Sequence, residues 1–408
     1  MKRLPRPLVV TALMVLLPAT TALTAAAAPG PAASVSASSG HGRADRSAPS
    51  PRLPEPTGAH AVGRSTLHLV DRDRPDPWVP EAGPRELMVD VYYPARAHTG
   101  RQAPYATTEE IRLFLKDRGL TGAVDPGVLS STRTNSRTDA RPEGGRHPLV
   151  VLSPGFSVSR YTQTVLAEEL ASRGYVVATV DHAYESAGTA FPGGRVLTCV
   201  ACEKAQTPAD FRAAARGRAE DISFVVDRLT GPRPAWRYAG LIDDRRIGVA
   251  GHSMGGASAA SAMARDDRLK AGLNMDGGFR DPVPAGGLDG RPFLLLGTDD
   301  ATHRPHGTDT TWDEAWQRLD GWKRWLTVSG SVHFSFCDMA WLTGQLGLPL
   351  ADPPPPLSGS RATDIVRAYA GAFFDQHLRG VPQPLLDGPD PAHPEVRFQD
   401  PAAERPRG

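Results

Sequence analysis

The stretch Gly251-His252-Ser253-Met254-Gly255 decides how this chain folds. It follows an apolar run over residues 247–250 and precedes the small residues 256–260, so a serine stands between a predicted buried strand and a predicted helix. A turn that lifts this serine off a sheet crowds its neighbours, and glycines two residues to either side leave room for it. The pattern predicts a nucleophile elbow in which Ser253 is the nucleophile.

A serine hydroxyl is a weak nucleophile until a base accepts its proton, so a histidine should follow later in the chain. His333 follows a predicted late strand and precedes a helix-forming segment, and we expect it to be the base. Other late histidines fit this position less well: His303 and His306 lie in a polar loop, His377 on the last predicted helix and His393 in the tail.

The acid that orients the histidine should stand at the C-terminal end of a strand. Asp276 ends the predicted strand that follows the elbow helix. Asp299 and Asp300 end the next predicted strand, which is the commoner place for the acid in this kind of fold. Residue order and spacing leave these three candidates open.

An ester carbonyl that is attacked by a nucleophile develops negative charge, and two backbone amides can stabilise it. In this fold one donor follows the nucleophile and the other lies in the loop after an early strand. These positions are Met254 and Phe156, and we expect their N–H groups to form the oxyanion hole. Asp181-His182 also ends a predicted strand but precedes the serine, so we expect it to order a loop at the rim.

Strands and helices alternate along most of the chain, which predicts a mostly parallel, doubly wound sheet: the α/β-hydrolase fold. Two strands at the N-terminal end should pair antiparallel, and residues 95–147, which contain few apolar side chains, should form a cap or rim. The predicted strands cover residues 65–71, 86–93, 148–152, 175–180, 246–250, 269–275, 292–296 and 325–328, and the predicted helices cover about 161–172, 209–229 and 361–378, with one more after the elbow.

The two ends of the chain differ from the middle in composition. Lys2, Arg3 and Arg6 precede an apolar stretch at residues 8–17, which predicts a secretory signal peptide over 1–27 and a secreted protein. Residues 28–63 are rich in Ala, Ser and Pro and are predicted to be a disordered leader. The hydrolase domain should span 64–384, and the proline-rich segment 385–408 should be a loosely attached tail.

The charge and residue spacing of the chain limit the ligands that we expect it to bind. The formal net charge of +1 and the absence of basic blocks argue against nucleic-acid binding, and no residue cluster has the spacing of a metal site or a phosphate loop, so no cofactor is expected.

Cys199 and Cys202 form a C-x-x-C in a predicted loop, and Cys337 is the third cysteine. A structural disulfide is favoured, and its pairing is left open, as is the oligomeric state.

Four blocks of sequence together resemble the platelet-activating factor acetylhydrolase family over about residues 65–380. They are residues 85–94, residues 251–256, an aspartate 23 residues after Ser253, and residues 330–333. The resemblance implies that Ser253 is the nucleophile, Asp276 the acid and His333 the base. The chain departs from the family in the segment Ser153-Pro154-Gly155-Phe156, where the family more usually has His-Gly.

These features predict a metal-independent serine ester hydrolase that works through an acyl-enzyme. The resemblance implies short acyl esters, such as the sn-2 acetyl or oxidised acyl group of phospholipids, with transient contact to a lipid surface. An alternative is a cutinase-like polyester or triglyceride lipase, for which Asp299 or Asp300 would be the acid. Acyl transfer to an acceptor other than water stays open. The candidate serine, acid and histidine follow one another in the proper order, which argues against a non-catalytic scaffold.

Overall fold

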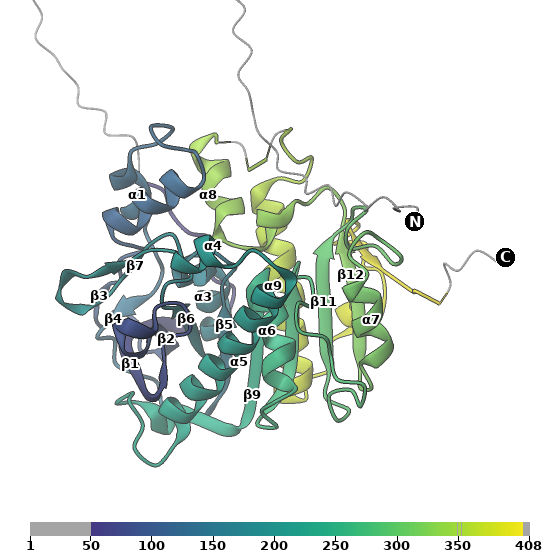
Figure 1. Cartoon of the computed structure of the whole chain (residues 1–408), viewed down its shortest axis with the longest axis horizontal. Helices are drawn as coiled ribbons and strands as arrows, with labels where there is room; N and C mark the ends of the chain where they lie inside the picture. Colours follow the sequence, from purple (N-terminus) through teal and green to yellow (C-terminus); the bar gives the residue numbers. More distant parts are fainter. Residues whose placement is uncertain (1–49, 349, 352, 403–408) are drawn as a thin grey trace, which may run out of the picture. The chain divides into compact units, whose positions relative to one another are not determined.

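The computed structural model describes residues 50–348, 350–351 and 353–402, and one sheet of eleven strands runs through this part of the chain (Figure 1). The predicted signal peptide and the leader up to residue 49 lie outside the described residues. The order across the sheet is β13-β12-β11-β10-β9-β5-β6-β2-β1-β4-β3. The strands are β1 (Ala61–Pro75), β2 (Pro84–Ala95), β3 (Arg101–Gln102), β4 (Arg137–Thr138), β5 (His147–Ser153), β6 (Val176–His182), β9 (Ile242–His252), β10 (Leu269–Met275), β11 (Phe293–Thr298), β12 (Lys323–Val328) and β13 (Val396–Phe398), while β7 (Thr189–Ala190) and β8 (Val196–Leu197) form a separate hairpin.

Six neighbouring strands, from β12 to β6, run parallel. β2 pairs antiparallel with β6, and β1 pairs antiparallel with β2. Residues 149–152 of β5 and 176–178 of β6 are continuous apolar runs and are fully buried. Such runs are typical of parallel strands that are covered on both faces. The predicted α/β-hydrolase fold, with its antiparallel N-terminal strands, is confirmed.

Helices cover both faces of the sheet, and α5 and α6 lie in front of it in Figure 1. One buried apolar cluster joins the sheet to α5, α6 and α7, and a second joins the opposite face to α3 and α9. The helices are α1 (Thr108–Asp117), α2 (Pro126–Ser130), α3 (Thr164–Ser172), α4 (Val200–Lys204), α5 (Pro208–Thr230), α6 (Met254–Met263), α7 (Thr311–Arg318), α8 (Asp338–Leu346) and α9 (Gly359–Arg379).

The start of α5 is fixed by local chemistry. The Thr207 hydroxyl accepts from the amide of Asp210, the Asp210 carboxylate accepts from the amide of Thr207, and Pro208 occupies the first turn. This capping box satisfies amides that a helix start leaves without partners. It fixes the residue at which α5 begins, and the inner face of this helix carries Arg218.

The segment 95–147 forms α1, α2 and the short strands β3 and β4 at the edge of the sheet. Its few apolar side chains are used for packing: Ile111, Phe114 and Leu115 are buried together with Met339 and Leu342 of α8. α1 and α8 therefore lie side by side at one end of the domain, as Figure 1 shows at the top.

The predicted leader extended too far into the chain. Leu53 is fully buried, the Thr57 amide and hydroxyl donate to Glu169, and β1 begins at Ala61. Backbone bonds also join Arg133 to Leu53 and to Pro51. Hydrogen bonds, rather than a repeating pattern of apolar side chains, hold most of this segment in place. Such contacts leave no clear pattern in the sequence, so the composition resembled that of a disordered chain.

The prediction of a loosely attached tail at 385–408 was also wrong for the residues that the structure describes. Leu386 is fully buried, β13 pairs antiparallel with β12, and Glu395 forms an ion pair with Arg361 of α9. One short strand and one buried leucine are enough to anchor the segment, although its sequence is rich in proline.

Candidate active site

Ser253 lies in the sharp turn between β9 and α6. Its backbone has φ 56° and ψ −123°, a conformation that residues other than glycine rarely adopt. A Cβ on Gly251 would lie 2.2 Å from the backbone of Gly255, and one on Gly255 would lie 1.9 Å from the carbonyl oxygen of Ser153. The two glycines are therefore required by close approach of the chain, as the elbow pattern predicts.

The loop after β5 passes directly beside this turn. A Cβ on Gly155 would lie 3.3 Å from the Cβ of Ser253, so the next amide in the chain, that of Phe156, lies close to the serine. Met254 supplies the first amide of α6. Within the described residues neither amide donates a hydrogen bond, which leaves both available as the predicted oxyanion donors.

Asp276 and His333 meet at the C-terminal edge of the sheet. The Oδ2 atom of Asp276, just past the end of β10, lies 2.6 Å from Nδ1 of His333, which begins the 3-10 turn His333–Phe336. Asp276 is only 3% exposed, whereas the His333 side chain is 45% exposed. The imidazole is thus fixed at Nδ1 by a buried carboxylate, while its ring lines the same pocket as Ser253.

Asp299 and Asp300 have other partners. The Asp299 carboxylate accepts from Arg304, Thr327 and Ser329, and Asp300 accepts from two amides of its own loop. Among the described residues, the carboxylate hydrogen-bonded to His333 is that of Asp276. This geometry favours Asp276 over the two later aspartates.

His303, which the sequence offered only as a less suitable candidate for the base, is a site residue in a different role. Its Nδ1 lies 2.9 Å from Oδ1 of Asp276, and the amide of Thr298 donates to the same oxygen at 2.7 Å. Burial by itself would raise the pKa of Asp276, but the bonds from His303 and His333 outweigh it and hold that pKa far below its ordinary range. The available signal was that the loop carrying His303 follows β11, the neighbour of β10 in the sheet.

His252 contacts both the backbone and the ring of His333. Its Nε2 lies 2.8 Å from the carbonyl oxygen of His333, and the two rings are 4.5 Å apart. Burial, together with repulsion from His333, lowers the pKa of His252 to about 3. His252 is therefore neutral at pH 7 and can donate a hydrogen bond to the loop that carries His333.

A pocket of about 380 Å³ opens above these groups. Ser253 and His333 line it together with Asp276 and His303, and the donor residues Phe156 and Met254 form part of its wall. Phe211 of α5 packs edge-to-face on Phe156 at 5.8 Å, and Arg280 lies at the same opening. The pocket has an aromatic side and a polar side.

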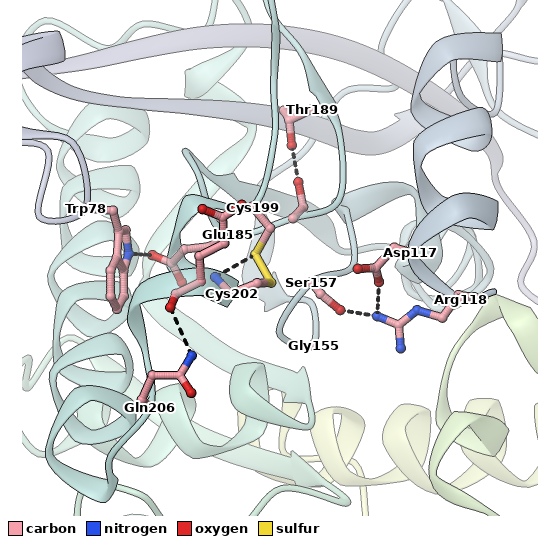
Figure 2. The surroundings of a disulfide bond; sticks show 12 residues. Trp78, Asp117, Arg118, Gly155, Ser157, Glu185, Thr189, Cys199, Cys202 and Gln206 are labelled. Atoms are coloured by element: carbon pink, nitrogen blue, oxygen red, sulfur yellow. Dashed lines mark hydrogen bonds and ion pairs between the residues drawn. A yellow bond between two sulfur atoms is a disulfide. The ribbon is translucent and has the colours of Figure 1, made fainter. Parts of the chain in front are cut away.

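The structure settles the cysteine pairing that the sequence left open. Cys199 and Cys202 form a disulfide at the N-terminal end of α4, which Figure 2 shows, and Cys337 is a free thiol. Burial raises the pKa of Cys337 to about 12. Ala201, between the paired cysteines, belongs to a buried cluster with Met254, so the disulfide turn packs behind the oxyanion donors.

Asp181 and His182 lie in the interior and not at the rim where we expected them. Both are buried: Asp181 pairs with Arg160, and His182 contacts Asp221 through Nδ1 at 2.8 Å and Ser153 through Nε2 at 2.9 Å. His182 therefore belongs to the interior beneath the loop after β5.

The described ranges contain no group of three or more His, Cys, Asp or Glu side chains arranged to hold a metal ion. In the same ranges every helix is too short or too polar to cross a membrane.

Comparison with known proteins gives a consistent result. The model of the family described as "Platelet-activating factor acetylhydrolase, isoform II" matches residues 46–193 and 236–379, which is more than half of the chain. A "Probable 1-alkyl-2-acetylglycerophosphocholine esterase" of Arthroderma benhamiae is 28% identical over 381 residues, covering 85% of this chain and 94% of that protein. A "Bis(hydroxyethyl) terephthalate hydrolase" of Streptomyces coelicolor is 26% identical over 213 residues, 48% of this chain and 57% of that protein.

Among solved structures, a "Ferulic acid esterase" from Streptomyces cinnamoneus superimposes with a TM-score of 0.77 at 45% sequence identity, covering 86% of this chain and all of that one. These relatives are named for ester cleavage, in agreement with a serine elbow and a buried carboxylate–histidine pair around one pocket. The chain belongs to the platelet-activating factor acetylhydrolase isoform II family and is a carboxylic ester hydrolase.

Proposed function

We propose that the protein cleaves short acyl esters through an acyl-enzyme on Ser253, with His333 as base and Asp276 as acid. The observation that carries the proposal is the common pocket: the elbow serine, the histidine bonded to a buried carboxylate and the two residues whose amides are the expected oxyanion donors all line it. This is the set of groups that acyl transfer requires.

The steps follow from this arrangement. Ser253 Oγ attacks the ester carbonyl carbon while His333 Nε2 accepts its proton, and the amides of Phe156 and Met254 stabilise the negative oxygen. The intermediate collapses, and His333 returns the proton to the departing alcohol. Water then attacks the acyl-enzyme with His333 again as base, which releases the acid and restores the serine. Asp276 stays ionised because its pKa is depressed, and it stabilises the imidazolium at each step.

For the substrate we propose the sn-2 acetyl or short oxidised acyl group of a phospholipid, in transient contact with a lipid surface. The family and the name of the fungal relative support this choice. An apolar pocket of about 190 Å³, lined by α1, α8 and Phe334 next to His333, offers a place for an apolar part of such a substrate. Secretion through residues 1–27 is part of the proposal, and a disulfide suits an oxidising compartment.

A second candidate is an aromatic acyl ester, including a terephthalate ester of the polyester type. Phe156 and Phe211 line the pocket at the nucleophile and present an edge-to-face aromatic pair against which a ring can stack. The ferulic acid esterase at 45% identity and the terephthalate hydrolase favour the same class.

The test compares kcat/KM for p-nitrophenyl esters from acetyl to palmitoyl, for a phospholipid with an sn-2 acetyl group and for methyl ferulate, with Ser253→Ala as the blank. The first proposal expects a maximum at acetyl or butyryl and cleavage of the phospholipid. A preference for methyl ferulate would select the aromatic candidate. Turnover that persists in Ser253→Ala would refute the acyl-enzyme on Ser253.

A further inference from the structure

We propose that Arg218 of α5 is a positioning residue for the oxyanion hole and that a buried network of charges fixes it for this task. The inference rests on the proposed role of the Phe156 amide. The Arg218 side chain is 1% exposed and does not line the pocket that holds Ser253. Any effect on the reaction must therefore pass through the loop after β5.

Arg218 contacts three consecutive residues of that loop. Its Nη1 donates to the carbonyl oxygen of Pro154 at 2.5 Å, and its Nη2 donates to the carbonyl oxygen of Gly155 at 3.4 Å. The guanidinium carbon also lies 5.9 Å from the centre of the Phe156 ring. One rigid fork thus spans the segment in which the chain departs from the family's usual sequence.

The geometry of the peptide bond explains why these carbonyls matter. The carbonyl of Gly155 and the N–H of Phe156 belong to one planar trans unit, so they point in opposite directions. Holding the carbonyl toward Arg218 aims the N–H to the other side, and Gly155 lies directly against Ser253. A cationic donor on the carbonyl also polarises the peptide group, which makes its N–H a stronger donor.

Arg218 is itself held by a chain of buried groups. Its Nε donates to Glu185 Oε2 at 2.6 Å, and Oε1 of Glu185 accepts from Arg85 at 2.8 Å and from Trp78 at 3.0 Å, the latter bond drawn in Figure 2. Arg85 also bonds Asp221 at 2.8 Å. These charged side chains are at most 2% exposed.

The network reaches the loop again at two further points. Asp221 bonds His182, which bonds the hydroxyl of Ser153 at the end of β5. The carbonyl of Glu185 accepts from the amide of Ser157 at 2.9 Å. The network therefore holds the loop before, within and after the Phe156 amide.

Stability is a weak explanation for this arrangement. Burying several ions costs free energy that their mutual attraction only partly recovers, and apolar replacements of similar volume are often at least as stable. Fixing the direction of a dipole before the reaction is a task for which buried charges are suited, because the dipole then needs no reorganisation when the oxyanion forms.

Three variants test the proposal in the full chain. Arg218→Lys keeps the charge and loses the fork, Arg218→Met removes the charge, and Arg218→Met with Glu185→Gln removes it without leaving an unpaired carboxylate. Arg216→Met is the matched control, because Arg216 lies on the same helix and pairs instead with Asp281. Each is assayed with p-nitrophenyl acetate for kcat and KM, and each is melted by circular dichroism.

We expect kcat to fall by about 30- to 300-fold, approaching the loss of one oxyanion donor, with KM changed by less than about threefold. Arg218→Lys should be intermediate, and Arg216→Met should match the wild type. Inhibition by a boronic acid, which forms a tetrahedral adduct, should weaken in parallel with kcat, whereas competitive inhibition by the product alcohol should not change.

A folded Arg218 variant with kcat within threefold of wild type would overturn the proposal, and so would losses confined to KM. Failure of all three variants to fold would assign Arg218 to the fold and overturn it as well. The underlying mechanism is checked separately by fluorophosphonate labelling of the wild type: absence of label on Ser253 would refute the proposed function, whereas labelling with unaffected Arg218 variants would refute this inference alone.

Discussion

Oδ1 of Asp276 lies 2.9 Å from Nδ1 of His303, while Oδ2 of the same carboxylate lies 2.6 Å from Nδ1 of His333. The acid is thus held between two imidazoles, of which only His333 follows the sequence pattern of a base. Burial lowers the pKa of His303, but its bond to Asp276 outweighs burial and raises it.

Replacing His303 by Gln should reduce kcat/KM by about tenfold, the cost of one charge-assisted hydrogen bond. Without that donor the pKa of Asp276 rises, so any loss of activity through protonation of this carboxylate should appear only at the acid end of the pH profile. A pH series of kcat/KM on p-nitrophenyl acetate measures both effects. His306→Gln, in the same loop but exposed, is the control, and equal behaviour of the two variants would contradict the expectation.

Asp276→Asn should lower kcat by about 10⁴-fold, because the amide leaves the wrong imidazole tautomer in place. Asp299→Asn should keep kcat within a few-fold and lower the melting temperature, since Asp299 bonds Thr327 in β12 and Ser329 just past the end of that strand. Steady-state assays with parallel melting curves distinguish them. The reverse pattern would identify Asp299 as the acid and support the cutinase-like alternative.

His252 should make the protein less stable in acid. Its pKa is about 3 in the folded chain against an ordinary value near 6.5, so between these values only the unfolded chain binds the proton. Stability that is complete above pH 6.5 is therefore lost as pH falls, at about 1.4 kcal/mol per pH unit. In His252→Asn this part of the slope should disappear from urea unfolding measured at pH 4, 5 and 6.

The exposed His98 gives the control for that experiment. His98 has φ 61°, which asparagine also tolerates, so His98→Asn should fold normally and leave the slope as it is in the wild type. A wild-type slope in His252→Asn would show that another group takes up the proton.

The disulfide should stabilise the protein modestly. Cys199 and Cys202 are three residues apart, and closing so short a loop is worth about 2 kcal/mol in the unfolded-state entropy model. Cys199→Ser with Cys202→Ser should lose about that free energy of unfolding in guanidinium titration.

A thiol assay without reductant should find one reactive group, that of Cys337, in the denatured wild type. In the native state this thiol should react slowly, because its pKa is raised to about 12. Three reactive thiols would contradict the pairing.

The sequence predicted the core well where burial is continuous. Residues 269–275 were predicted as a strand and form β10 over the same residues, because an apolar run between polar turns has few other ways to be buried. The elbow was equally readable, since its glycines report a local crowding that any such turn creates. Each of these two signals is contained within a few neighbouring residues of the chain.

The missed features depend on contacts between distant segments. His303 reaches Asp276 only because β10 and β11 are neighbours, and Arg218 reaches Pro154 across 64 positions. The boundary predictions at 28–63 and 385–408 relied on composition, whereas Leu53 and Leu386 show that one buried side chain and a few backbone bonds can anchor a polar segment. The signal peptide stays a prediction.

The strand β13 covers the open edge of β12 by pairing with residues 326–328. The proline-rich sequence suggests that the chain could be cut before residue 396. A protein shortened in this way would expose the backbone groups at the edge of β12 to water. Unpaired strand edges recruit other strands, so the trimmed protein should self-associate during expression and purification. Expression designs for this enzyme should therefore retain the chain through Phe398, even though these last residues lie far from Ser253 in the sequence.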